Sequence, residues 1–122
     1  MFRVIVAGSR QFNDYELLKQ ELDRLLVNKT SEGIQVVCGE ARGADSLGKQ
    51  YAIEKGYSVA SYPADWNRYG KAAGYYRNQQ MADNADALVA FWDGISSGTE
   101  NMIQIARQKR MPVRIVRYKE KK

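Results

Sequence analysis

A chain of 122 residues is about one domain long, and 44% hydrophobic residues with only two prolines indicate a folded core. The single cysteine, Cys38, excludes an internal disulfide, and the lack of histidine argues against common transition-metal sites and rules out an imidazole base. No apolar run approaches the ~18 residues of a membrane span, and the first residues lack a signal-peptide layout. We therefore expect one domain over residues 1–122, cytoplasmic, with no required cofactor, no metal and no membrane partner.

The net charge is +5, and residues 117–122 form a basic tail. Positive charge favours anionic ligands or nucleic acid, although a charged chain end is more often simply solvated. We expect the tail to be frayed and rank nucleic acid below a small anionic partner. The sequence leaves a homo-oligomer open.

Short apolar runs alternate with segments typical of helices, which predicts an α/β doubly wound fold with a parallel sheet. The expected strands are 2–7, 34–38, 57–62, 87–92 and 112–116. After a first helix, further helices are expected at 44–55, 70–84 and 99–110. Ligands in such folds bind at the carboxyl ends of the strands, so the turns that follow the strands are where function is expected.

The first helix is predicted from leucines on one helical face, at positions 18, 22, 25 and 26. Asn13, with Glu16 three residues later, resembles a capping box with asparagine in the capping position. We therefore expect this helix to begin directly after Asn13.

The turn after the first strand reads Gly8-Ser9-Arg10. Glycine lets the backbone approach a ligand, serine can donate a hydroxyl, and the arginine fork can bind a phosphate or carboxylate. An ordinary tight turn would explain the same three residues equally well.

The turn after the second strand has two glycines around an arginine at an expected helix start, where free N–H groups and the helix dipole favour an anion. The candidate ligand-binding residues in this turn are Gly39, Arg42, Gly43 and Asp45. Asp45 is ambiguous, because an acidic residue in a first helical turn is favoured without any ligand.

After the fourth strand, small and hydroxylated residues lead into a helix, as a backbone nest for phosphate requires. The candidates here are Asp93, Ser97, Gly98 and Thr99. The segment lacks a Walker lysine and does not match GxGxxG, which argues against a P-loop nucleoside triphosphatase. Ser97 or Thr99 could instead serve only as the cap of the helix. A cap side chain accepts hydrogen bonds from the same free N–H groups at the helix start that would bind a phosphate.

A segment dense in aromatic and cationic residues lies between the third strand and the third helix. Trp66 and a tyrosine could stack on a base while Lys71 and Arg77 neutralise phosphate, but we expect the rings to pack as a satellite core. Arg77 is the better candidate, because it falls in a helix directed toward the sheet end. Asp65 and Asn78 complete the candidate ligand-binding set.

Several segments in chain order carry a family resemblance: 8–10, 39–45, 63–66, 70–74 with 77–78, and 97–99. Together they resemble the YspA-like branch of the SLOG superfamily over nearly the whole chain. The resemblance implies a three-layer Rossmann-like fold with a five-stranded parallel sheet in the order 3-2-1-4-5 and about four helices. It also implies a pocket for a nucleotide or nucleotide-derived ligand at the first and fourth strands.

The superfamily includes LOG-type phosphoribohydrolases, which cleave an N-glycosidic bond with an arginine and a glutamate. Arg77 is similar to their arginine and is the candidate catalytic residue, and Gly98-Thr99 is similar to their glycine-threonine step. Met102 stands where those enzymes carry the glutamate. Binding is therefore the expected function and hydrolysis the alternative, with no spacing that selects another carboxylate.

A third alternative is single-stranded nucleic-acid binding, as in the DprA relatives of the superfamily. The positive charge, the aromatic residues and the basic tail motivate it.

Overall fold

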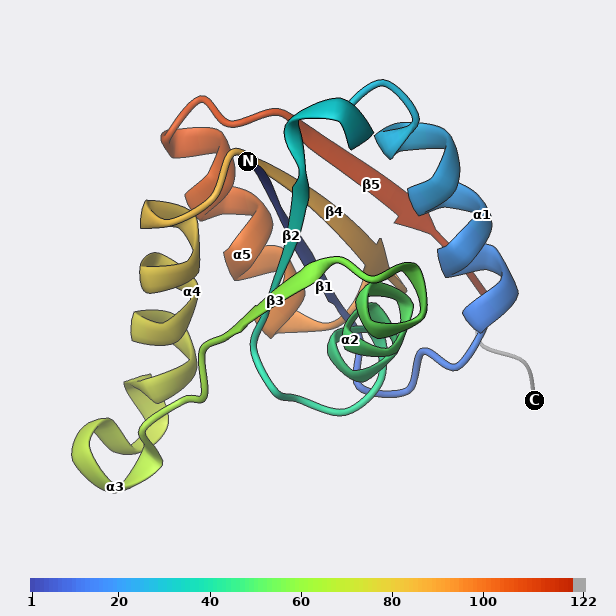
Figure 1. The fold of residues 1–122 in the computed structure, drawn as a ribbon. Helices are drawn as coiled ribbons and strands as arrows, with labels where there is room; N and C mark the ends of the chain where they lie inside the picture. Colours follow the sequence, from blue (N-terminus) through green and yellow to red (C-terminus); the bar gives the residue numbers. More distant parts are fainter. Residues whose placement is uncertain (120–122) are drawn as a thin grey trace.

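The computed structural model describes residues 1–119 and contains one parallel five-stranded sheet (Figure 1). The strands are β1 (Phe2–Gly8), β2 (Ile34–Cys38), β3 (Ser58–Ser61), β4 (Ala87–Trp92) and β5 (Val113–Arg117). Their order in the sheet is β3-β2-β1-β4-β5. The expected fold class and strand order are therefore confirmed.

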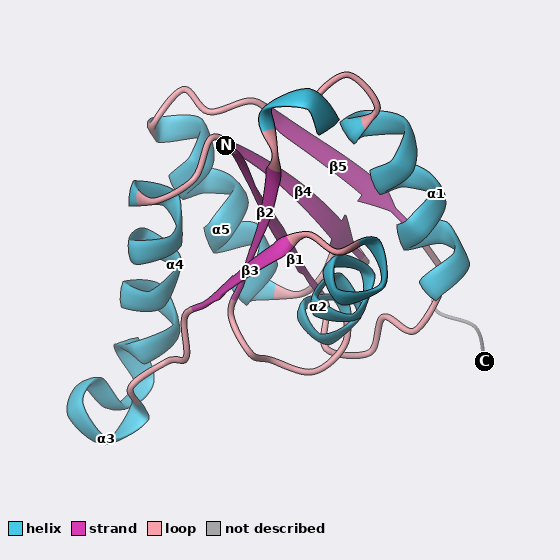
Figure 2. Cartoon of the chain, in the orientation of Figure 1, coloured by secondary structure: helices cyan, strands magenta, loops and turns pink. Residues whose placement is uncertain are grey.

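Four longer helices cover the sheet within the described range, and a single-turn helix and two 3₁₀ turns lie in the connections (Figure 2). The helices are α1 (Tyr15–Leu26), α2 (Ala44–Lys55), α3 (Trp66–Tyr69), α4 (Ala73–Asp83) and α5 (Ser97–Gln108). The 3₁₀ turns are η1 (Thr30–Glu32) and η2 (Gly70–Ala72). No helix in this range is long and apolar enough to cross a membrane.

Alternating residues of β1 divide the hydrophobic core into two layers, because successive side chains of a strand point to opposite faces. Val4 and Val6 pack with α1 and α2, whereas Ile5 and Ala7 pack with α4 and α5. The sheet is thus enclosed on both faces, which explains why β1, β2 and β4 are apolar nearly throughout.

Three helix starts differ from the sequence expectation. The cap of α1 is Asp14 rather than Asn13, because the Asp14 carboxylate accepts a hydrogen bond from Leu17 N at 3.1 Å. The helix expected over 70–84 begins as η2 and becomes α4 only at Ala73, and the helix expected at 99–110 is α5, which starts at Ser97. A single-turn helix that was not expected, α3, precedes η2 and ends at Gly70, which has φ 55°.

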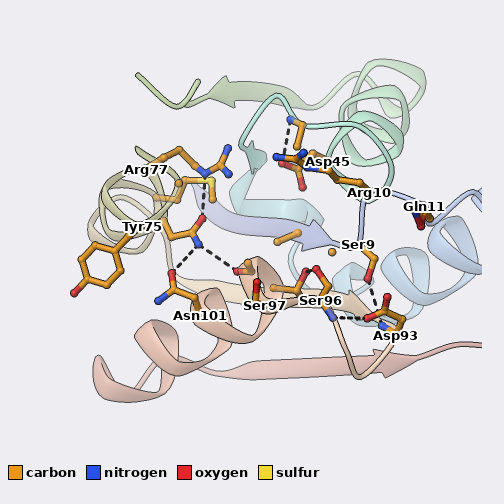
Figure 3. Close-up of a pocket in the computed structure, with 18 of the residues that line it drawn as sticks. Ser9, Arg10, Gln11, Asp45, Tyr75, Arg77, Asp93, Ser96, Ser97 and Asn101 are labelled. Carbon is orange, nitrogen blue, oxygen red and sulfur yellow. Dashed lines mark hydrogen bonds between the residues drawn. The ribbon is translucent and has the colours of Figure 1, made fainter. Parts of the chain in front are cut away.

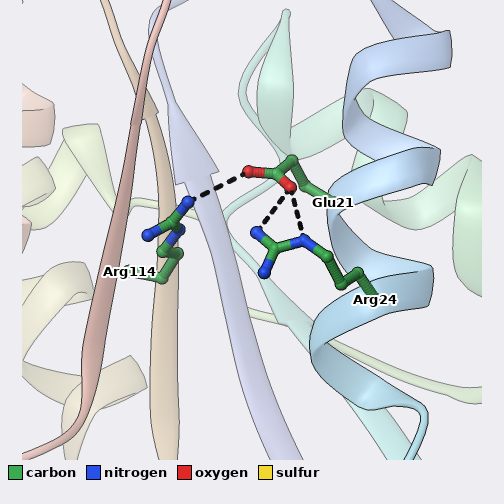
Figure 4. A network of polar contacts seen from close by, with 3 residues as sticks. All are labelled: Glu21, Arg24 and Arg114. Atoms are coloured by element: carbon green, nitrogen blue, oxygen red, sulfur yellow. Dashed lines mark hydrogen bonds and ion pairs between the residues drawn. The ribbon is translucent and has the colours of Figure 1, made fainter.

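A polar network joins α1 to the edge strand β5 (Figure 4). Glu21 accepts hydrogen bonds from Arg24 at 2.8 and 3.2 Å and from Arg114 at 3.5 Å. The bond from Arg24 lowers the pKa of the Glu21 carboxyl despite the opposing effect of burial. The network therefore links α1 to β5, the strand at one edge of the sheet.

The basic tail expected at 117–122 begins later than predicted. Arg117 is the last residue of β5, and its guanidinium carbon lies 5.4 Å from the centre of the Trp92 ring. Tyr118 N donates to the Trp92 carbonyl oxygen at 3.3 Å. Residues 120–122 of the predicted tail lie outside the described residues.

The close packing of α2 on β1 requires glycine at position 48. A Cβ at Gly48 would lie 2.7 Å from Val6 Cγ1 and 2.8 Å from Val6 Cβ. We predict that Gly48→Ala lowers the free energy of unfolding by about 1–3 kcal/mol, although alanine is the better helix former. Urea denaturation measures this change. The control is Gly98→Ala, because no atom lies within 4 Å of a Cβ built there and no loss is expected; equal stability of Gly48→Ala and the wild type would contradict the prediction.

Candidate functional site

A cavity of about 560 Å³ opens at the carboxyl ends of β1 and β4 (Figure 3). Parallel pairing sets Gly8 opposite Phe91, so the turns that follow these two strands lie side by side. The cavity has the volume of typical small-molecule sites and lies where the strand order reverses. The predicted site residues that line it are Gly8, Ser9, Arg10, Asp45, Trp66, Lys71, Arg77, Asn78, Asp93, Ser97, Gly98 and Thr99.

The other four predicted residues lie nearby but outside this cavity. Gly39 and Arg42 line a neighbouring cavity of about 290 Å³. Gly43, with φ 77°, packs against the backbone of the first turn, where a Cβ would lie 2.7 Å from the Arg10 carbonyl carbon. Asp65 caps α3 by accepting a hydrogen bond from Arg68 N at 3.1 Å.

Ser9 and Asp93 connect the first and fourth turns. Ser9 is buried; its backbone N–H donates to the Phe91 carbonyl, and its Oγ accepts a hydrogen bond from Asp93 N at 3.4 Å. The Asp93 carboxylate in turn accepts hydrogen bonds from Ile95 N at 2.9 Å and Ser96 N at 2.8 Å. Although burial opposes them, these bonds lower the pKa of Asp93. Asp93 is therefore an ionised group that shapes the loop leading into α5.

The N-terminus of α5 faces the cavity without a side-chain cap. Its N-cap residue is Ser96, so neither Ser97 nor Thr99 serves as the cap. The first helical hydrogen bond runs from Glu100 N to Ser96 O. The backbone N–H groups of residues 97–99 precede it and therefore have no partner within the helix. These groups and the positive end of the helix dipole favour an anion in the cavity.

Arg77 joins α4 to the end of β2. Its Nη1 donates to the Gly39 carbonyl oxygen at 2.5 Å, and its Nε donates to Asn78 Oδ1 at 3.0 Å. The buried Asn78 donates from Nδ2 to the Gly98 carbonyl at 3.3 Å and to Asn101 Oδ1 at 3.0 Å. This chain of hydrogen bonds fixes the α5 N-terminus relative to Arg77 (Figure 3).

The Asp45 side chain holds the turn after β2 together by hydrogen bonds. Its carboxylate accepts hydrogen bonds from Gly39 N at 3.2 Å and Ala41 N at 3.3 Å, and the side chain is buried. Burial raises the pKa of Asp45 to about 6, against the opposing effect of the Arg77 charge. Three N–H groups expected to be free are therefore engaged: Asp45 accepts from Gly39 N and Ala41 N, and Ala44 N donates to Ser9 O at 3.4 Å. The start of α2 has no side-chain cap.

The cavity is rich in cations and has aromatic rings at its rim. Arg10 and Lys71 are exposed, line the cavity and have no ion pair within residues 1–119. The expectation that the aromatic residues pack as core is wrong, since Trp66 is 52% and Tyr75 49% exposed and both line the cavity. The sequence pattern alone does not distinguish an aromatic ring that is exposed at the cavity from one that packs in the core.

Several lining residues were not found from the sequence, among them Gln11, Tyr75, Ser96 and Asn101. Ser96 carried a signal, because a serine before a helix start is a common cap residue. Asn101 carried none, because its role depends on Asn78 of another helix. Only the folded chain brings those two amides together.

The sequence profile of the YspA, cpYpsA-related SLOG family, YAcAr, matches residues 2–69. The chain belongs to this family. It is also similar to the Gene 61 protein of Mycobacterium phage D29, with 36% identity over 123 aligned positions that cover 93% of this chain and 94% of the relative. The similarity therefore extends past the profile match to the region of α4 and α5.

Solved structures share the fold of this YAcAr protein. A structural-genomics protein, TM1055, is 25% identical with a TM-score of 0.67, over 93% of this chain and 72% of that one. DprA of Streptococcus pneumoniae is 16% identical with a TM-score of 0.71, over 93% of this chain and 49% of DprA. DprA of Helicobacter pylori, described with a single-stranded DNA binding mode, is 19% identical with a TM-score of 0.66, over 93% of this chain and 64% of DprA.

The raised pKa of Asp45 predicts a pH dependence of stability. The folded protein holds this proton more tightly than the unfolded chain, so ionisation costs stability from about pH 4 upward, and the cost is complete above about pH 6. We predict that the unfolding free energy of the wild type, minus that of Asp45→Asn, falls by about 1 kcal/mol between pH 5 and pH 7. Urea denaturation of both proteins at each pH measures the difference. A constant or rising difference would contradict the pKa direction.

Proposed function

We propose that this protein binds a nucleotide or nucleotide-derived ligand, with a phosphate held at the N-terminus of α5. The observation that carries the proposal is the uncapped α5 N-terminus lining the same cavity as Arg10 and Arg77. Backbone N–H groups, the helix dipole and guanidinium groups are the donors that phosphates take in proteins. Membership of a SLOG family and the cavity volume support the same proposal.

The rim of the cavity suits the remainder of such a ligand. Trp66 and Tyr75 present exposed rings to the cavity, and flat aromatic faces are favourable partners for a nucleobase. Lys71, without an ion pair among residues 1–119, adds a positive charge at the same rim. The base would therefore lie against α3 and α4 while the phosphate lies against α5.

The contacts favour binding over hydrolysis. Met102, at the position where LOG-type enzymes carry glutamate, is 1% exposed and packs in the core. Asp45 and Asp93 line the cavity, but both carboxylates already accept two backbone hydrogen bonds. Both bonds go to one oxygen of each carboxylate, Oδ2 of Asp45 and Oδ1 of Asp93, so the case against hydrolysis rests on Met102 and not on these two groups.

Single-stranded nucleic acid is a second candidate ligand, and the exposed aromatic rings favour it. Besides Trp66 and Tyr75, the rings of Tyr69 and Tyr76 are exposed, and they lie 4.5 Å apart between centroids. Stacking on exposed rings beside cations is the usual mode of single-strand binding. Binding of a labelled oligonucleotide that weakens steeply with salt and is lost in Tyr76→Ala would support this candidate; no binding at low salt would exclude it.

A carboxylate placed at the α5 N-terminus should block the phosphate without unfolding the protein. Gly98→Asp has open space for its side chain, and an acidic residue in the first helical turn stabilises a helix by about 0.3–1 kcal/mol. In thermal-shift assays with AMP, GMP, CMP and UMP, we expect at least one nucleotide to raise the melting temperature of the wild type. We expect Gly98→Asp to lose that rise. The control Gln104→Glu changes the charge equally on an exposed position of α5 and should keep it.

A retained thermal shift in Gly98→Asp would contradict phosphate binding at α5. No thermal shift of the wild type with any of the four nucleotides, at millimolar concentration, would contradict the proposed function itself.

Arg10 should contribute charge to the ligand and little to the fold. It is exposed and makes no ion pair within residues 1–119, so Arg10→Ala should leave the melting temperature of the free protein unchanged. We expect a loss of nucleotide affinity of about tenfold or more, the size of one hydrogen bond to a charged group. Isothermal calorimetry measures the affinity, with Arg107→Ala, an exposed arginine of α5 outside the cavity, as the control. Equal losses in both variants would show a general charge effect instead.

A further inference from the structure

A second cavity adjoins the proposed phosphate site. Its volume is about 290 Å³, and it shares Arg10, Ala41, Trp66 and Arg77 with the first cavity. The two cavities therefore lie on either side of the same side chains. A ligand that occupies both cavities would pass these shared residues.

The second cavity has its own polar groups, which the proposed function does not use. Glu40 and Arg42 line it, and both are exposed. Within residues 1–119, neither of them nor Arg10 takes part in an ion pair, so Glu40 does not neutralise the two guanidinium groups. Arginine forks suit a phosphate, and a free carboxylate is a strong acceptor for hydroxyl groups.

The backbone holds Glu40 in a position that the chain would not adopt freely. Its φ is 58°, in the left-handed region, which costs a residue with a Cβ roughly 1–2 kcal/mol. The hydrogen bonds from Gly39 N and Ala41 N to Asp45 fix the residues on both sides of it. The backbone from which Glu40 extends is therefore held in place beside the cavity by Asp45.

We propose that the ligand is a nucleoside diphosphate joined to a sugar, bound across both cavities. The first phosphate lies at the α5 N-terminus, the second lies between Arg10 and Arg42, and hydroxyl groups of the terminal sugar donate to Glu40. This inference rests on the proposed function, because it takes the position of the first phosphate from it. A mononucleotide would leave Glu40 and Arg42 without a ligand contact.

Calorimetry on the full chain with three matched ligand series separates these contacts. The series are AMP, ADP and ADP-ribose; UMP, UDP and UDP-glucose; and GMP, GDP and GDP-mannose. In the series whose base the protein accepts, we expect affinity to rise about tenfold at the second phosphate and again at the sugar, since each adds hydrogen bonds to a charged group.

Two variants assign each step to its residue. Arg42→Ala should lower the affinity for the diphosphate and the sugar nucleotide about tenfold and leave the mononucleotide unchanged. Glu40→Gln keeps the size of the side chain and should lower the affinity for the sugar nucleotide alone. Arg107→Ala is the control for loss of one positive charge, and melting temperatures verify that each variant is folded.

Mononucleotide binding with no gain from the second phosphate or the sugar would overturn this inference and leave the proposed function standing. The same holds if Arg42→Ala weakens all ligands of a series equally. If none of the nine ligands binds the wild-type protein, the proposed function and this inference both fail.

Discussion

The site depends on one buried carboxylate. Asp45 gives up hydration to accept hydrogen bonds from Gly39 N and Ala41 N, and burial raises its pKa to about 6. The positive charge of Arg77 offsets part of the cost of burying this carboxylate. Burial lowers the pKa of Arg77, and the charge of Asp45 opposes that change. The turn after β2 is thereby folded around an internal anion. The N–H groups of Gly39 and Ala41 are committed to this carboxylate, so the donors that we propose for an external anion are those of α5.

Those donors are at the other side of the cavity. Arg77 donates to the Gly39 carbonyl and to Asn78, and Asn78 holds the Gly98 carbonyl. The end of β2, the middle of α4 and the first turn of α5 are thus linked by hydrogen bonds. A change at any of them would move the α5 N–H groups relative to Arg77, which gives these residues a positioning role beside any contact with ligand.

Much of this arrangement follows from the sequence, for a physical reason. Strand periodicity and glycine turns are local properties, so β2, α2 and β4 have the bounds that the sequence predicts. Parallel pairing then brings the turns after β1 and β4 together, which makes Ser9, Arg10 and Thr99 predictable neighbours. The helix of Arg77 is predictable in the same way, because its pattern precedes an apolar strand.

The remainder depends on contacts between distant segments. The sequence allows Asp45 either to meet a ligand or to favour a helix start, and only the folded turn shows that it closes on Gly39 and Ala41. The exposed Trp66 lies on α3, a single-turn helix that was not expected and that ends at Gly70, where φ is positive. Asn101 has no local signal, since its partner lies on α4.

The central claim is that an external phosphate meets the backbone of α5 and not the turn after β2. Titration of ¹⁵N-labelled protein with inorganic phosphate, followed by amide chemical shifts, tests it most directly. The account predicts saturable shifts that are largest at Ser97, Gly98 and Thr99 and small at Gly39 and Ala41, whose N–H groups are already bonded to Asp45. Shifts centred on Gly39 and Ala41, or no saturable shift at the α5 amides, would contradict it.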